Sequence, residues 1–162
     1  MELTIAPNGV LQIDDCRIVY RNFSGAATKY NREGDRNFAL VIDSQEISDA
    51  LVEAGWNVKI KPPREEGEEP FRTLKVNVNF NDRGPNVYLV TGKARVLLDE
   101  NTVKRLDNVD IARVDVDIAP HDWEMPDGRC GRSAYLRSMK VIHNPDRFEE
   151  EFAREDEEAS VF

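Results

Sequence analysis

Cationic and aromatic side chains are interleaved between residues 17 and 38 of this 162-residue chain. Single-stranded nucleic acid is held by cations along its backbone and by aromatic rings under its bases, so this pattern is typical of a binding groove. Lysines on the polar faces of two later strands extend the groove. The candidate nucleic-acid-binding residues are Arg17, Arg21, Phe23, Lys29, Tyr30, Arg32, Arg36, Lys59, Lys61 and Lys75. The alternative is that Phe23 belongs to the core and the arginines form an ordinary solvated face.

Two other clusters could support catalysis or metal binding. The stretch from His121 to Glu124 lies near Cys130 in the sequence, but it has no recognised spacing of metal ligands. Asp14, Asp15, Asp115 and Asp117 could form the carboxylate cluster of a nuclease, although alternating acids on a strand are more typical of a solvent face. The sequence has no glycine-rich phosphate loop, nucleophile elbow or Cys–His pairing signal. We therefore expect no enzymatic activity, no metal and no cofactor.

The charge is unevenly distributed along the chain. The net charge is −9, which by itself argues against a nucleic-acid partner. Residues 146–162, however, hold eight acidic and two basic side chains, whereas residues 16–38 hold five basic and two acidic ones. The body without the tail carries only −3. Overall acidity therefore does not exclude binding to a polyanion.

The acidic tail ends in an aromatic residue, Phe162. A tail that only improves solubility has no use for such an end, whereas an aromatic anchor with a free carboxylate suits a basic pocket on a partner. The candidate partner-binding residues are Glu155, Asp156, Glu157, Glu158 and Phe162. We expect the tail to be disordered, apart from a short helical piece over residues 148–153. The alternative is a solubilising tail.

Strand signals dominate the rest of the chain. Alternating or continuous apolar runs predict strands at residues 16–23, 37–43, 56–60, 74–80, 87–98, 114–118 and 134–142, the fifth bent at Gly92. One clear helix is predicted after Asp43, whose spacing to Glu46 resembles a capping box, and it ends at Gly55. Residues 24–36 form a long exposed loop between two strands. Trp56 shares an apolar face and is expected in the core, while Trp123 fits either core or surface.

These elements predict a mostly β protein, with an antiparallel barrel of the OB type carrying insertions, because closure removes exposed sheet edges. A β-sandwich is the alternative. Residues 1–145 would form the binding domain and residues 146–162 the tail. No apolar run approaches the ~20 residues that a membrane helix needs, and no signal peptide is visible, so we expect a cytoplasmic protein without membrane contact.

The run from Cys16 to Gly25 and the pieces 29–34 and 36–38 resemble the phage-encoded single-stranded DNA-binding proteins. So do residues 56–63 and 87–92, and the similarity covers roughly residues 10–145. It implies an OB-fold and sequence-independent binding and protection of single strands during phage DNA replication or recombination, in the host cytoplasm. The tail is similar to the acidic tip with terminal Phe of bacterial and phage single-stranded DNA-binding proteins, which recruits replication and repair enzymes, so we expect replication or recombination proteins as partners. The oligomeric state, monomer or homo-oligomer, stays open.

A second hypothesis is an acidic protein-interaction module, or a DNA mimic that inhibits a host nucleic-acid enzyme. The net charge favours the mimic, whereas the separation of the basic cluster from the acidic tail favours the DNA-binding protein.

Overall fold

The computed structural model describes residues 1–160 of the chain. Its strands are β1 (Glu2–Ile5), β2 (Leu11–Asn22), β3 (Asn37–Ile42), β4 (Val58–Lys61), β5 (Phe71–Asn77), β6 (Asn86–Thr91), β7 (Ala94–Leu98), β8 (Ile111–Glu124) and β9 (Cys130–His143). Its helices are α1 (Gln45–Glu53), the 3-10 helix η1 (Val103–Asp107) and α2 (Arg147–Ser160).

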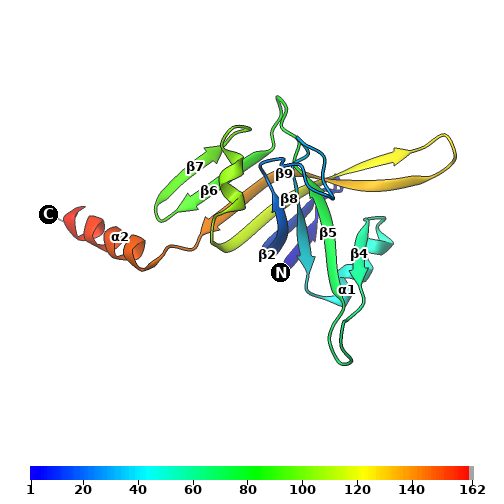
Figure 1. Cartoon of the computed structure of the whole chain (residues 1–162), viewed down its shortest axis with the longest axis horizontal. Helices are drawn as coiled ribbons and strands as arrows, with labels where there is room; N and C mark the ends of the chain where they lie inside the picture. The colour runs from blue at the N-terminus through cyan, green and yellow to red at the C-terminus, as the bar shows by residue number, and fades with distance from the viewer. Residues whose placement is uncertain (161–162) are drawn as a thin grey trace.

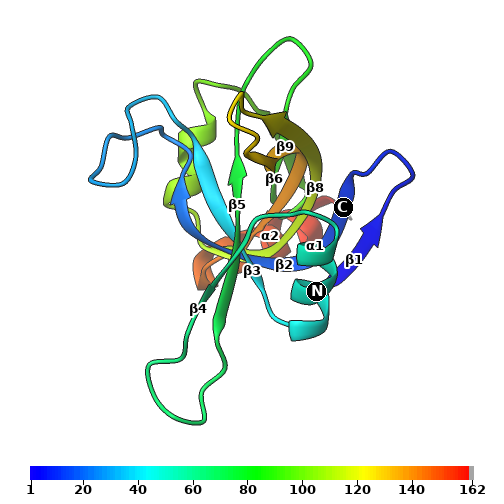
Figure 2. The same cartoon turned by 90° about the vertical axis from the view of Figure 1, so that its right-hand side faces the viewer.

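Strands β5, β3, β2, β8 and β9 follow one another as hydrogen-bonded neighbours, and a further pairing of β5 with β9 closes the ring. The closing contact is parallel and joins Val76 to Ala134, whereas the other pairs within the ring are antiparallel. Figure 2 shows this ring nearly end-on, with β4 beside β5 outside it. The predicted mostly β, OB-like barrel is therefore confirmed.

The core lies inside the ring and follows from strand alternation. Phe38 and Leu40 of β3 face inward beside their partners Val76 and Leu74 of β5, and all four side chains are buried. Trp56 is also buried, as the sequence predicts. Alternation points every second side chain into the barrel, while Thr73 and Lys75 of β5 lie on its outer face.

The predicted helix is present as α1, but its N-cap is Ser44 and not Asp43. The Ser44 hydroxyl accepts a hydrogen bond from the N–H of Ile47, which satisfies a donor of the first helical turn. Asp43 instead lies 3.8 Å from the N-terminal ammonium of Met1. Gly55 adopts a φ of +95° just after the helix, so the predicted stop is confirmed.

Several strand predictions differ from the structure: β1 was not predicted, β2 begins at Leu11, and β5 spans Phe71–Asn77 instead of residues 74–80. Residues 87–98 form a hairpin, β6 and β7, because Gly92 with its φ of +60° turns the chain back instead of bending one strand. Strands β8 and β9 extend beyond the predicted residues, since they continue as a two-stranded arm that projects from the barrel in Figure 1.

Residues 147–160 of the acidic tail form helix α2, where the sequence analysis expects disorder beyond a short helical piece. The Asp146 carboxylate accepts a hydrogen bond from the N–H of Glu149, and glutamate is a good helix former, so the segment can sustain the longer helix. Helix α2 points away from the barrel in Figure 1. Phe162 lies outside the described residues. Among the helices of residues 1–160, none combines the length and apolar character needed to cross a membrane.

Candidate nucleic-acid interface

Cross-strand register places basic side chains of neighbouring strands in rows on the outside of the barrel. Arg17 pairs with Val41, Val41 with Thr73, and Thr73 with Lys59, so this row crosses four strands. Directly paired residues share one face of a sheet, which puts Arg17 and Lys59 on the same side. The adjoining rows contribute Lys75 on one side and the Lys61–Phe71 pair on the other.

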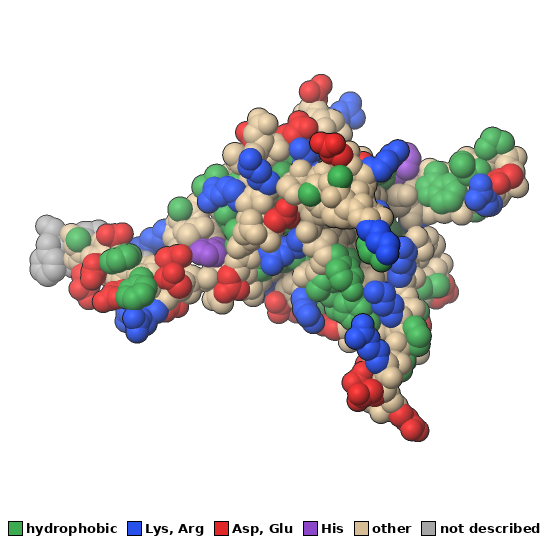
Figure 3. All heavy atoms as spheres, in the orientation of Figure 1, with side chains coloured by type: hydrophobic (Ala, Val, Ile, Leu, Met, Phe, Trp, Pro, Cys, Tyr) green, Lys and Arg blue, Asp and Glu red, His purple; other side chains and the backbone are tan. Residues whose placement is uncertain are grey.

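We call the surface formed by Arg17, Lys59, Lys61 and Lys75, together with Tyr20 and Phe71, the basic face. Figure 3 shows hydrophobic side chains with Lys and Arg side chains around them over the region where Figure 1 labels β5 and β4. Four of the ten residues predicted to bind nucleic acid are thus brought together on one surface.

Tyr20 is a component of the basic face that the sequence analysis missed. Its φ is +53°, and the β2–β3 register shifts between Val19 and Asn22, so a β-bulge breaks the alternation of β2 here. The ring is 63% exposed, meets Phe71 edge-on at 6.4 Å, and lies 5.4 Å from the Lys61 ammonium. An exposed ring beside a cation is therefore presented on this surface.

Phe71 was missed as well, but the sequence holds a signal for it. Phe71, Thr73 and Lys75 are each two residues apart, so they share one face of the strand. Extending the predicted strand from residue 74 back to residue 71 therefore places Phe71 on the polar face with Lys75.

Phe23 does not reach this surface, which corrects its assignment as a DNA-binding residue. The side chain is fully buried and stacks on Phe38 with 5.5 Å between the ring centroids. The bulge at Tyr20 adds one residue to β2 and so turns Phe23 toward the core. Its backbone N–H donates to the Asp107 carboxylate, which holds it in place.

Arg21 and Arg36 are engaged with neighbouring parts of the protein. One guanidinium nitrogen of Arg21 donates to the carbonyls of Leu106 and Val109 at 2.8 and 2.7 Å, and so supports η1 and the residues after it. The Arg36 guanidinium lies 3.5 Å from the Glu100 carboxylate and 5.8 Å from the Phe80 ring. Both guanidinium groups are thus engaged within the protein, and their contact with DNA stays a prediction.

The loop of residues 24–36 presents the remaining predicted contacts. Tyr30 is 88% exposed and lies 5.7 Å from the Lys29 ammonium, and Arg32 is exposed with its guanidinium 3.6 Å from Asp35. The Asn31 side-chain amide donates to the carbonyls of Ala26, Arg32 and Asp35, which gives the loop a defined shape. In Figure 2 the loop projects from the barrel.

An acidic loop limits the basic face where β4 and β5 are joined. The connection runs from Pro62 to Pro70 and contains Glu65, Glu66, Glu68 and Glu69. These four carboxylates outnumber the one cation of the connection, Arg64, so a polyanion on the basic face would be directed toward the opposite end of β5.

Two of the four carboxylates considered for a nuclease, Asp115 and Asp117, form contacts within the protein. Asp115 accepts a hydrogen bond from the N–H of Asp15 and lies 3.1 and 3.2 Å from the nitrogens of Arg113 and Lys140. Burial opposes ionisation of Asp115, but these hydrogen bonds outweigh it and lower its pKa. Asp117 accepts a hydrogen bond from Ser138.

The stretch around His121 is likewise occupied by structural contacts. The His121 ring packs edge-on against Tyr135, and the Asp122 carboxylate pairs with Arg132. Within residues 1–160, no three His, Cys, Asp or Glu side chains converge as a metal site would require.

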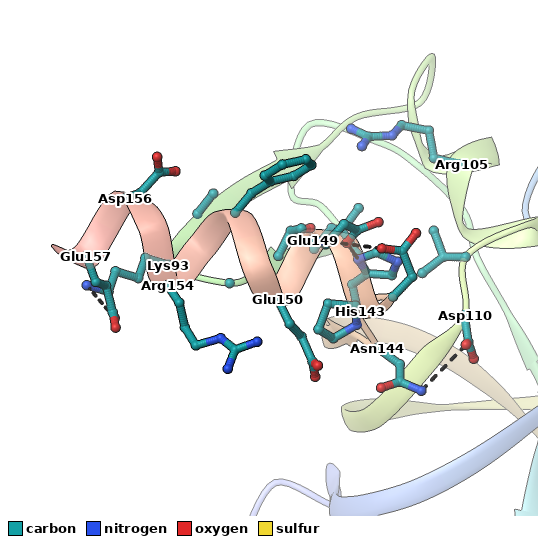
Figure 4. A pocket seen from close by; sticks show the side chains of 18 of the residues that line it. Lys93, Arg105, Asp110, His143, Asn144, Glu149, Glu150, Arg154, Asp156 and Glu157 are labelled. Atoms are coloured by element: carbon teal, nitrogen blue, oxygen red, sulfur yellow. Dashed lines mark hydrogen bonds and ion pairs between the residues drawn. The ribbon is translucent and has the colours of Figure 1, made fainter. Parts of the chain in front are cut away.

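The predicted partner-binding residues lie on α2, apart from Phe162. Glu157 forms an ion pair with Lys93 of the β6–β7 turn at 2.8 Å, and Glu149 lies 3.4 Å from His143. Figure 4 shows these contacts across a cleft of about 1560 Å³ between α2 and the β6–β7 hairpin. The pKa of Glu157 is lowered by its hydrogen bond to Lys93. The acidic helix is thus held beside β6 and β7, away from the basic face.

The sequence and the fold of this chain are both similar to those of known proteins. The sequence profile of the family described as "Putative phage ssDNA-binding domain" matches residues 4–160. Two solved structures share the fold, both of the single-stranded DNA-binding protein from bacteriophage Enc34. The first has a TM-score of 0.56 at 13% identity and covers 91% of this chain and 93% of that one. The second, a C-terminal truncation, has a TM-score of 0.54 at 14% identity and covers 89% and 91%. No curated protein sequence matches the chain.

Proposed function

Because the chain belongs to the family of phage single-stranded DNA-binding domains, which is not a family of enzymes, we propose that it binds single-stranded DNA without sequence preference through the basic face. The observation that supports this most is the row of paired residues that places Arg17 and Lys59 on one surface beside the exposed ring of Tyr20. Cations on this surface would neutralise phosphates, and the rings would stack on bases of any sequence.

The exposed loop of residues 24–36 extends the proposed site. It follows β2, the strand that carries Arg17 and Tyr20 of the basic face, and its Lys29 and Tyr30 present a cation and a ring together. A strand lying on the basic face could continue onto this loop.

We propose that the protein protects single strands during phage DNA replication or recombination, in the cytoplasm of the host cell. Residues 1–145 would bind DNA. Residues 146–162 would recruit a replication or recombination protein through Glu155, Asp156, Glu157, Glu158 and the terminal Phe162.

Titration of labelled oligo(dT) and of a duplex of equal length, with and without magnesium, tests DNA binding. We expect tighter binding to the single strand, no degradation, and an affinity that falls with salt by a log–log slope of roughly −0.7 per neutralised phosphate. Degradation would favour a nuclease, the absence of binding would favour the acidic mimic, and a flat salt response would contradict the electrostatic part.

Two substitutions test the basic face itself. Lys59→Ala should reduce the salt slope by somewhat less than one unit, because one phosphate contact is lost. Lys104→Ala removes the same charge from η1, outside the rows of the basic face, and should leave the slope near the wild-type value. Equal slopes for the two variants would place the DNA elsewhere.

Tyr20→Ala tests the contribution of the ring. We expect it to weaken oligo(dT) binding by about 1–3 kcal/mol with an unchanged salt slope, because stacking releases no counterions. Tyr20→Phe keeps the ring and is the matched control, with affinity close to wild type. Fluorescence anisotropy at several salt concentrations measures both quantities, and an unaffected Tyr20→Ala protein would exclude stacking at this position.

A further inference from the structure

A cleft of about 510 Å³ opens where β4 and β9, which pair with successive parts of β5, diverge. β5 pairs with β4 up to Leu74 and with β9 from Val76 onward, so Lys75 between them borders an opening in the sheet. The side chains that matter in its lining are Trp56, Lys75, Asn77, Trp123, Arg132 and Ser133. Among the described residues that line the cleft none is acidic, in contrast to the rest of this acidic chain.

Trp123 forms one wall of the cleft in a defined position. It lies opposite Gly131 in the β8–β9 register, and a Cβ added to Gly131 would come within 2.5 Å of the Trp123 ring. The indole therefore lies directly on the glycine backbone, which only a residue without a side chain permits. The side chain is nevertheless 41% exposed, so part of the ring stays open. Hydrophobic side chains are visible on the projecting arm in Figure 3.

Arg132 joins the arm to the body of the protein behind this ring. Its guanidinium donates to both oxygens of Asp122 at 2.6 and 3.1 Å and to the carbonyl of Ala54 at 2.9 Å. It also lies 5.4 Å from the ring of the buried Trp56. The base of the arm is thereby held against the segment after α1, so Trp123 is presented on a supported element.

We propose that this cleft is a nucleobase subsite, in which one base of single-stranded DNA stacks on Trp123 while Lys75 contacts the adjoining phosphate. The inference rests on the proposed function and extends the DNA-binding surface from the basic face into the cleft. Lys75 belongs both to the basic face and to the cleft, so the two surfaces are continuous. The four glutamates at the β4–β5 connection would direct the DNA toward this end of β5.

Intrinsic fluorescence tests the stacking directly. The chain contains two tryptophans, so replacing one isolates the emission of the other. In the Trp56→Phe variant the emission comes from Trp123 alone, and saturation with oligo(dT) should quench it. Anisotropy of a labelled oligo(dT) is recorded in the same titration and reports binding independently. Full binding without a change in Trp123 emission would overturn the subsite while leaving the proposed function intact, and the absence of binding by the wild-type protein would overturn both.

Substitutions measure the contribution of the subsite to affinity. Trp123→Ala should weaken oligo(dT) binding about 5- to 150-fold, the range for one stacked base, with an unchanged salt slope. Gly131→Ala keeps the indole but displaces it, and should weaken binding in the same direction. Met125→Ala removes another exposed apolar side chain from the arm and should bind like wild type. Wild-type affinity in both Trp123→Ala and Gly131→Ala would overturn the proposal.

Cys130 provides a readout without any substitution. It is exposed and lines the cleft, whereas Cys16 is buried, and burial raises the pKa of the Cys16 thiol to about 12. A thiol reagent should therefore modify Cys130 selectively. Saturating oligo(dT) should slow this reaction severalfold at constant ionic strength. An unchanged rate while the oligonucleotide is bound would contradict occupation of the cleft.

Discussion

Tyr20 and Phe23 occupy opposite surfaces from those that strict alternation along β2 assigns to them. The bulge between Val19 and Asn22 adds one residue, so the side chains beyond it change faces. The Tyr20 ring, which alternation would place on the face of Cys16, becomes part of the basic face, and the Phe23 ring, which was expected at the interface, becomes a core residue. At the scale of single residues, the aromatic contacts of the proposed interface therefore depend on one local irregularity.

Phe23→Ala should consequently lower stability and not act as a binding mutation. Removing a fully buried ring that stacks on Phe38 is expected to reduce the free energy of unfolding by about 3–5 kcal/mol. Denaturant unfolding measures this loss, and oligo(dT) titration under conditions where the variant is folded should give a salt slope like that of wild type. A stable Phe23→Ala protein with impaired binding would contradict the burial of this ring.

At the scale of elements, Asp115 joins three strands. It accepts from the N–H of Asp15 in β2, where φ is +52°, and pairs with Arg113 of its own strand and Lys140 of β9. The register of β2 with β8 shifts between Ile13 and Cys16, next to this contact. The carboxylate thus stabilises an irregular position of β2 through neighbouring strands.

The lowered pKa of Asp115 leads to a pH-dependent prediction. A carboxyl whose pKa is lower in the folded than in the unfolded protein contributes stability above its ordinary value of 3.8, and this contribution is lost as the pH falls through the folded-state pKa. Asp115→Asn should therefore be less stable than wild type at neutral pH, and the difference should shrink below about pH 4. Urea unfolding at several pH values measures this difference, and a difference independent of pH would contradict the assigned role.

The exposed Asp127, which pairs with Arg129 in the turn between β8 and β9, offers the matched control. Asp127→Asn removes the same charge from a solvent-exposed pair, and such pairs contribute little to stability. We expect its unfolding free energy to stay near wild type at each pH.

At the scale of the whole molecule, the acidic tail and the basic face lie on different parts of the structure. Helix α2 contacts the β6–β7 turn through Lys93 and the end of β9 through His143. At low salt, where the screening length is about 30 Å at 0.01 M, we expect the field of the tail to act on an approaching polyanion. The tail should weaken DNA binding over distance, without contacting the DNA.

Deletion of residues 146–162 tests this effect. The net charge changes from −9 to −3, so affinity for oligo(dT) should rise at low salt, and the gain should diminish near 0.1 M salt, where the screening length is about 10 Å. Titration of the full-length and shortened proteins at two salt concentrations measures the gain. Equal affinities at low salt would leave the tail without influence on DNA binding.

Deletion of Phe162 alone is the matched control, because it removes no side-chain charge. DNA affinity should be unchanged, and binding to a replication or recombination protein should be lost if the terminal ring is the proposed anchor. A shortened protein that still binds such a partner would contradict the anchor.

Several features of this protein could be predicted from its sequence because they depend on local periodicity and composition. The alternation around Lys59, Lys61 and Lys75 correctly places these residues on polar strand faces, and the spacing after Asp43 predicts α1 to within one residue of its cap. The apolar run of β3 predicts a buried strand for the same reason. Periodicity of this kind follows from backbone geometry and needs no knowledge of the partner strand.

Other features were decided only by the tertiary structure. The row that joins Arg17 to Lys59 exists because β3 and β5 lie between their strands, and periodicity within one strand does not specify its neighbours. The bulges of β2 are supported by contacts distant in sequence, such as that of Asp115, so alternation alone cannot reveal them. Trp123 lines the cleft because the register of β8 and β9 places it opposite Gly131. The residue types of the interface are thus visible in the sequence, whereas their common surface arises from strand pairing.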